Sequence, residues 1–151
     1  MKRFEEKIKT YPIINFVIAL SLAIIAYVFL QAWNDQFSPL YIKIILLAVI
    51  VLEILVFLNF RELTVSVENN QLILAFGVFR KKIWIGEIAK IEESEYQFRN
   101  YNGYGIRFGR DKTIGYVPCG GKGLKIFFKN SKKQIFFITK RAEELKQMLS
   151  K

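Results

Sequence analysis

Two long apolar runs fill most of the first 60 residues and constrain the fold more than any other feature. Residues 13–30 contain only Asn15 and Ser21 as polar interruptions. The second run, residues 40–60, contains three strongly polar residues: Lys43, Glu53 and Asn59. Each run reaches the roughly 20 residues that a helix needs to cross a bilayer. The sequence therefore predicts a transmembrane helical hairpin.

Proline positions set the expected bounds of the two helices. Pro12 suits the first turn of a helix, where its missing N–H has no intrahelical partner to lose. Ser38 followed by Pro39 repeats this pattern, with a cap residue before a proline. We therefore expect helices at about 12–33 and 39–60, joined so closely that they are antiparallel neighbours.

The chain is expected to divide into an N-terminal membrane part, residues 1–60, and one small domain, residues 61–151. Residues 1–10 carry mixed charge and are expected to extend the first helix as an amphipathic stub. A cleavable secretory signal would have a shorter apolar core, so the first helix is expected to be retained.

Positive charge lies on one side of the two runs. Four basic and two acidic residues precede them, the connection carries only Asp35, and Lys43 offsets Glu53, so +9 of the net charge of +10 lies on residues 61–151. This asymmetry predicts a multi-pass protein with both termini in the cytoplasm. A basic domain held there attracts anionic lipid headgroups.

Three kinds of chemistry are excluded by composition. The chain has one cysteine, Cys119, and no histidine. It therefore has no intramolecular disulfide, no zinc site of the usual kind and no histidine-based acid–base catalysis. We expect no catalytic residue, no metal site and no cofactor, and we predict that the protein is not an enzyme.

After residue 60 the pattern changes to alternation, which is typical of strands. Leu63, Val65 and Val67 fall on one face, and Asn69 with Asn70 favours a tight turn into the next strand. Further alternating segments predict six or seven short antiparallel strands. Residues 139–149 predict an amphipathic helix that begins at Thr139. The expected fold class is α+β: the hairpin, then an antiparallel β-barrel or sandwich closed by a C-terminal helix.

Four short segments within residues 61–151 resemble those of a known protein family. They are Gly103-Tyr104-Gly105-Ile106-Arg107, Tyr116, Gly121-Lys122-Gly123-Leu124, and Ile138-Thr139-Lys140-Arg141. Together with the hairpin they resemble bacterial pleckstrin-homology-like (PH-like) proteins with a two-helix membrane anchor. The resemblance implies a PH-like domain in the cytoplasmic (inner) membrane of a bacterium. It implies little about function, because this fold serves lipid binding, peptide binding and scaffolding.

Two groups of residues are candidates for lipid or partner binding. Arg80, Lys81 and Lys82 form the densest basic run and are expected in an inter-strand turn, where they contact anionic lipid or simply keep an edge strand from pairing. The second group surrounds a Gly- and Tyr-rich segment: Arg99, Tyr101, Tyr104 and Arg110. Its tyrosines are expected to pack internally or to line a partner surface. The segment partly matches an RNA-recognition strand, but Asn102 replaces the basic residue required, so we expect no nucleic acid.

Glu53 needs an explanation because an unpaired carboxylate in hydrocarbon costs at least a few kcal/mol. Ser21 lies at a similar depth, so that a hydrogen bond between the two side chains is geometrically possible. Glu53 is then a contact or relay inside the membrane, or alternatively a carboxyl that is protonated or reaches the interface.

These features favour a membrane-tethered PH-like interaction or scaffolding module. Its partner is expected to be a protein, with membrane lipid as a supporting contact. An alternative function is a small subunit of an envelope or transport complex that uses Glu53 as its intramembrane contact. A second alternative is an RNA-binding module.

Overall fold

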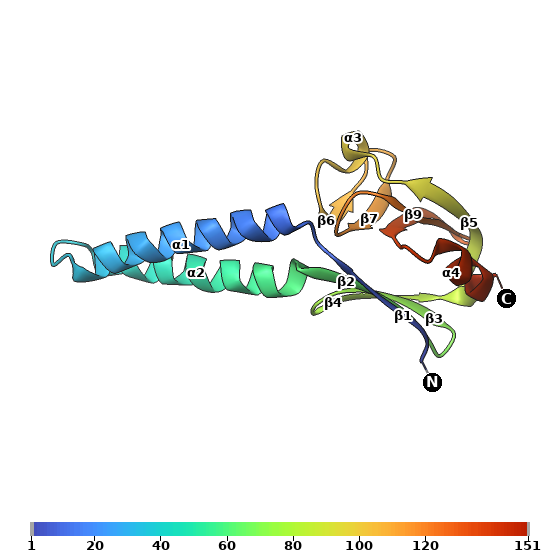
Figure 1. Ribbon diagram of the computed structural model, residues 1–151, viewed down its shortest axis with the longest axis horizontal. Helices are drawn as coiled ribbons and strands as arrows, with labels where there is room; N and C mark the ends of the chain where they lie inside the picture. The colour runs from blue at the N-terminus through green and yellow to red at the C-terminus, as the bar shows by residue number, and fades with distance from the viewer. Residues whose placement is uncertain (1, 151) are drawn as a thin grey trace.

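The computed structural model describes residues 2–150 of the chain. Figure 1 shows a long helical hairpin attached to one end of a domain built from two sheets. The elements in chain order are β1 (Lys2–Lys9), α1 (Pro12–Asn34), α2 (Leu40–Phe60), β2 (Glu62–Glu68), β3 (Gln71–Phe76), β4 (Phe79–Trp84), a 3₁₀ turn (Ile85–Glu87), β5 (Ile88–Glu95), α3 (Phe98–Tyr101), β6 (Gly105–Phe108), β7 (Thr113–Val117), β8 (Lys122–Phe128), β9 (Ser131–Ile138) and α4 (Ala142–Leu149).

Helices α1 and α2 form the expected antiparallel hairpin (Figure 1). Their mean hydropathies are 2.7 and 2.8, none of their residues is buried, and both are long and apolar enough to span a membrane. Pro12 occupies the first turn of α1, as predicted. Helix α2 begins one residue later than expected, at Leu40, and Ser38 makes no side-chain cap, because Pro39 itself is the extended residue that precedes the helix.

The expectation of an N-terminal helical stub is wrong: residues 2–9 form strand β1, which pairs antiparallel with β2. Phe4 and Ile8 from this strand are buried in the core. Two hydrogen bonds hold the strand in place beside the end of α2, from Thr10 N to Arg61 O at 2.9 Å and from Thr10 Oγ1 to Phe60 O at 2.6 Å. The paired strands β1 and β2 thus continue directly into the paired helices.

The domain consists of two open sheets with strand orders β1-β2-β3-β4 and β5-β8-β9-β7-β6. A closed barrel, one of the two expected arrangements, is therefore not formed. The prediction of uniformly antiparallel pairing is also wrong, because β7 runs parallel to β9. The expected six or seven strands did not include β1, and the described residues form nine strands in the two sheets. Each sheet keeps two edges, and β4 is one of them.

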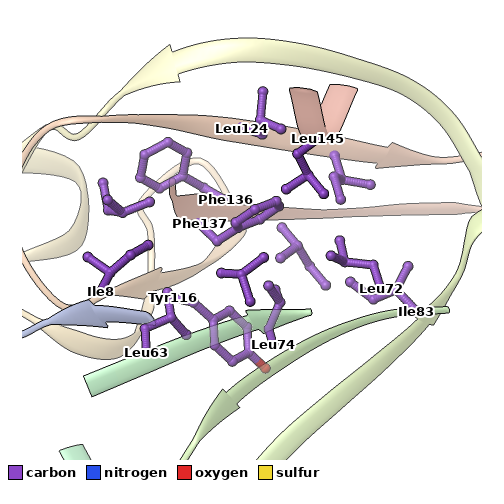
Figure 2. Close-up of a cluster of buried hydrophobic side chains, with 14 of the residues drawn as sticks. Ile8, Leu63, Leu72, Leu74, Ile83, Tyr116, Leu124, Phe136, Phe137 and Leu145 are labelled. Atoms are coloured by element: carbon purple, nitrogen blue, oxygen red, sulfur yellow. The ribbon is translucent and has the colours of Figure 1, made fainter. Parts of the chain in front are cut away.

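The hydrophobic core lies between the two sheets. Figure 2 shows Ile8, Leu63 and Leu74 from the first sheet facing Phe137 from the second. Leu145 enters the same core from α4, which lies at the end of the domain opposite the hairpin (Figures 1 and 2). The predicted C-terminal helix is therefore confirmed.

Thr139 is not the cap of α4, because the helix begins three residues later, at Ala142. The threonine is buried and donates a hydrogen bond from Oγ1 to Glu6 Oε2 at 2.6 Å. Lys140 N donates to the other oxygen, Glu6 Oε1, at 2.9 Å. A single carboxylate of β1 therefore holds the segment between β9 and α4.

Candidate functional site

The basic run Arg80, Lys81 and Lys82 lies within strand β4, and its expected place in a turn is wrong. The turn is Gly77-Val78, where Gly77 has φ +54°, as a type II′ hairpin requires at its first loop position. Asn59 at the end of α2 explains why the hairpin bends there, since its Oδ1 accepts a hydrogen bond from Val78 N at 2.8 Å.

The three basic residues do not share one face of the sheet. Arg80 lies opposite Ala75 and Lys82 opposite Ile73, on the outer face, whereas Lys81 lies opposite the buried Leu74. All three basic side chains are exposed, and none forms an ion pair with another residue in the described range 2–150.

The free edge of β4 carries regularly spaced backbone groups. Phe76 and Phe79 flank a two-residue loop and therefore form a hydrogen-bonded pair. From Phe79 onward, every second residue of β4 bonds to β3 through its backbone, and the residues between them do not. The bond from Ile85 N to Asn70 O, at 3.1 Å, agrees with this alternation, because Ile85 lies an even number of residues after Phe79. The N–H and C=O groups of Arg80, Lys82 and Trp84 therefore point away from β3. The outer edge of β4 is a cationic strand edge open to pairing.

The two exposed aromatic residues of β4, Phe79 and Trp84, lie at opposite ends of the strand. Phe79 stacks on Phe60, the last residue of α2, with ring centroids 5.6 Å apart. Trp84 is at the other end of β4, roughly 15 Å farther from the helices by strand rise. Its exposed indole therefore belongs to the free strand edge and lies away from the helix ends.

The second candidate group contains tyrosines that pack internally. Tyr101 is buried and stacks on Phe136 at 5.5 Å and on Tyr96 at 5.8 Å. Burial raises the pKa of Tyr101 to about 12, because it disfavours the phenolate. Tyr104 meets Tyr11, beside the start of α1, edge to face at 5.4 Å. These rings connect the hairpin to the second sheet, so Tyr101 offers no free face on which a base could stack.

Arg99 in α3 and Arg110 in the turn between β6 and β7 are both exposed. Arg110 N donates to Asn100 O at 3.1 Å, which joins α3 to the turn between β6 and β7. Asn100 Nδ2 reinforces the join by donating to Asp111 Oδ1 at 3.0 Å. The structure therefore brings these two residues together beside the second sheet, whereas the basic residues of β4 belong to the first.

Asp111 holds α3 to the turn between β6 and β7, and its contribution to stability is expected to depend on pH. Burial alone would raise the pKa of Asp111, but hydrogen bonds from Lys125 (2.8 Å), Asn100 and Thr113 outweigh it and hold the pKa well below its usual range. The ionised carboxylate therefore stabilises the fold above the ordinary carboxyl pKa of about 4, and this contribution disappears as the pH falls toward the depressed value.

We expect Asp111→Asn to lower the free energy of unfolding by about 1 kcal/mol at pH 7, a figure reduced because the side chain is exposed. The difference in unfolding free energy between wild type and variant should become smaller as the pH is lowered from about 5 to 2. Urea unfolding of the full chain in detergent at several pH values measures it. A difference in unfolding free energy that stays constant over this pH range would contradict the lowered pKa of Asp111.

The hydrogen bond that the equal depth of Ser21 and Glu53 allows is present. Ser21 Oγ donates to Glu53 Oε1 at 2.7 Å. The second oxygen, Glu53 Oε2, is buried and has no hydrogen-bond partner among residues 2–150. Lys43 lies near the other end of the hairpin, where its ammonium donates to Trp33 O at 3.3 Å and to Asp35 O at 3.4 Å. Lys43 is thus paired at the helix connection, and Glu53 retains an unused acceptor.

A further group of basic residues was missed by the sequence analysis. Lys9, Arg61 and Lys140 line a pocket of about 770 Å³ where the helices join the sheets. Lys9 and Arg61 flank the two apolar runs, so the hairpin itself predicts that they are close. Lys140 is remote in sequence and is brought there by the bonds from Thr139 and Lys140 to Glu6.

Comparisons with known proteins identify no relative. No protein-family model matches the chain, and neither a curated protein nor a solved structure matches it. Within residues 2–150, no three His, Cys, Asp or Glu side chains are grouped so that they could hold a metal ion. Function must therefore be argued from the free edge of β4, the helical hairpin and the junction between helices and sheets.

Proposed function

We propose that this protein is a membrane-tethered interaction module of PH-like type. In this proposal α1 and α2 anchor the chain in the cytoplasmic membrane of a bacterium, with both termini in the cytoplasm. The basic residues that flank the hairpin support this orientation. Two sheets with a C-terminal helix at one end support the PH-like description. The protein is not an enzyme, and anionic lipid is a supporting contact.

The observation that carries the proposal is the open, cationic edge of β4. An extended segment of a partner protein can pair with the outward N–H and C=O groups of Arg80, Lys82 and Trp84, as in other cases of strand addition. The exposed side chains of Arg80 and Lys82 favour acidic residues in that segment. The partner in this proposal is therefore an acidic, extended protein segment at the membrane surface.

In this proposal, the junction between the hairpin and the domain holds the edge of β4 close to the membrane. The Thr10 bonds and the β1–β2 pairing join the helices to the first sheet without a flexible linker. Strand β4 belongs to that same sheet. The edge of β4 therefore has a fixed position and direction relative to the bilayer. Only a partner segment that lies near the membrane can reach it.

A pair of variants at Lys82 tests the proposal. Lys82→Pro removes the outward N–H without breaking a bond to β3, whereas Lys82→Ala removes only the charge. We place a photoreactive residue at position 84 of the full chain in its native membrane and measure cross-linked protein adducts. The adduct should fall about tenfold in Lys82→Pro and only two- to threefold in Lys82→Ala. Equal adduct in wild type and Lys82→Pro would exclude strand addition at β4.

A second candidate function, a subunit of a membrane complex, is favoured by Glu53. Its Oε2 has no hydrogen-bond partner among residues 2–150, and a rotation that turns this buried oxygen outward would let it accept a hydrogen bond from a polar residue of another membrane protein. We expect a photoreactive residue at exposed Leu52 to form a discrete adduct that Glu53→Gln abolishes. The same substitution should leave the adduct at position 84 unchanged. If the Leu52 adduct is absent, or persists in Glu53→Gln, this candidate is rejected.

A further inference from the structure

The pocket at the junction of helices and sheets, which we call the junction pocket, joins two chemically different surfaces. Its wall on the helix side includes Pro12 and Asn15 from α1 and Phe57 from α2. Its wall on the domain side includes Lys9 and Lys140. Because the helices are apolar and the domain is basic, the pocket lies at the level where a bilayer changes from hydrocarbon to headgroups.

The junction pocket carries an excess of unpaired positive charge. Lys9, Arg61 and Lys140 are exposed and form no ion pair within residues 2–150. The acidic residue in its lining, Glu62, is engaged by Lys7 at 3.6 Å, and Lys7 does not line the pocket. Cys119 adds no negative charge, because burial, opposed by nearby Lys140, raises the pKa of its thiol.

The lining matches the parts of a phospholipid in their order across the bilayer surface. The guanidinium of Arg61 can bind two phosphate oxygens at once, and the ammonium groups of Lys9 and Lys140 add charge without fixed geometry. Tyr11 and Asn15 add polar groups to the same lining. Phe57 then begins the apolar surface of the helices, along which an acyl chain can lie. The volume, about 770 Å³, is within the usual range for a small-molecule site.

We propose that the junction pocket binds the phosphate headgroup of an anionic glycerophospholipid, with the acyl chains against α1 and α2. This inference rests on the membrane placement proposed above and does not depend on the free edge of β4. It assigns the lipid contact to Lys9, Arg61 and Lys140, away from Arg80, Lys81 and Lys82. A bound lipid would also stabilise the junction, because it contacts both helices, the first sheet and the segments that contain Cys119 and Lys140.

The test compares Arg61→Gln with Arg80→Gln in the full chain in nonionic detergent. Both variants lose one exposed arginine, but Arg80 lies outside the junction pocket. A second matched pair is Lys140→Gln and Lys133→Gln, since Lys133 is at the opposite end of β9, roughly 15–20 Å away. Native mass spectrometry and thermal unfolding measure binding of dioctanoyl phosphatidylglycerol, dioctanoyl phosphatidylcholine and glycerol 3-phosphate.

We expect phosphatidylglycerol to bind at least about tenfold more tightly than phosphatidylcholine. Arg61→Gln should weaken this binding about tenfold and Lys140→Gln severalfold, with less than twofold change in Arg80→Gln and Lys133→Gln. Without lipid, the unfolding temperatures of all four variants should match. If Arg61→Gln does not fold, the Lys140 and Lys133 pair carries the test.

Three results would overturn the inference. Equal losses in Arg61→Gln and Arg80→Gln would mean diffuse surface attraction. Equal binding of both phospholipids would exclude recognition of the anionic headgroup. Binding of glycerol 3-phosphate as tight as that of phosphatidylglycerol would identify a soluble phosphate as the ligand. Because Lys82→Pro leaves the pocket intact, failure of strand addition and failure of lipid binding are separately visible.

Discussion

Replacing Ile8 by alanine is expected to destabilise the whole domain, although the residue precedes both apolar helices. Its side chain is 2% exposed and packs among Leu63, Phe137 and their neighbours between the sheets (Figure 2). Truncation of a buried isoleucine to alanine costs roughly 2–5 kcal/mol, since the cavity is only partly refilled. For a domain of this size the unfolding temperature should fall by about 10 °C or more. Thermal unfolding of the full chain in detergent measures the effect.

The control is Lys7→Ala, the adjacent position on the opposite face of β1. Lys7 is exposed and its ion pair with Glu62 is a surface pair, so the variant should lose less than about 1 kcal/mol. If Ile8→Ala unfolds at the same temperature as Lys7→Ala, strand β1 is not part of the folded domain. The same reasoning predicts that a chain beginning at Arg61 is unstable, because it leaves the β1 edge of β2 and part of the core uncovered.

Gly123→Ala is expected to have the largest effect of any single methyl group in the protein. A Cβ at Gly123 would overlap the carbonyl oxygen of Phe137 and lie 2.9 Å from its carbonyl carbon. These are backbone atoms of β9, the strand paired with β8, so no side-chain rotation can relieve the clash. The end of the β8–β9 ladder must separate, and we expect a loss of at least about 3 kcal/mol.

Gly86→Ala provides the matched control. A Cβ there would meet no atom within 4 Å, and the residue does not have a positive φ. We expect this variant to be neutral or up to about 1 kcal/mol more stable, because alanine restricts the unfolded chain. Hydrogen exchange should show faster exchange of the β8 and β9 amides in Gly123→Ala alone. Unchanged protection in that variant would mean that the two strands are packed less closely than described.

Local patterns were sufficient for features that depend on neighbouring residues. The alternation of Leu63, Val65 and Val67 correctly placed β2, and Asn69 with Asn70 correctly placed its turn, where both have positive φ. The apolar runs correctly placed the hairpin. Its antiparallel geometry was enough to show that Ser21 and Glu53 could form the bond that the structure contains, because equal distances from the connection imply equal depth.

The basic residues show where local patterns were not sufficient. The sequence identified Arg80, Lys81 and Lys82 as a group, but it did not indicate that strand pairing divides them between two faces. Likewise, the Gly- and Tyr-rich segment gave no sign that Tyr101 is covered by Phe136, a residue 35 positions later. Which charges and rings remain available to a partner depends on contacts between distant strands.

The amino-acid sequence by itself determined the two apolar helices, their antiparallel arrangement, most strands and the C-terminal helix, since each has a period or a turn signal of its own. Only the tertiary structure decided that residues 2–9 form a strand. Phe4 and Ile8 are four residues apart, a spacing that places side chains on one face of a helix and equally on one face of a strand. Pairing with β2, more than 50 residues away, removes this ambiguity, and the same long-range closure assembles Lys9, Arg61 and Lys140 around one pocket.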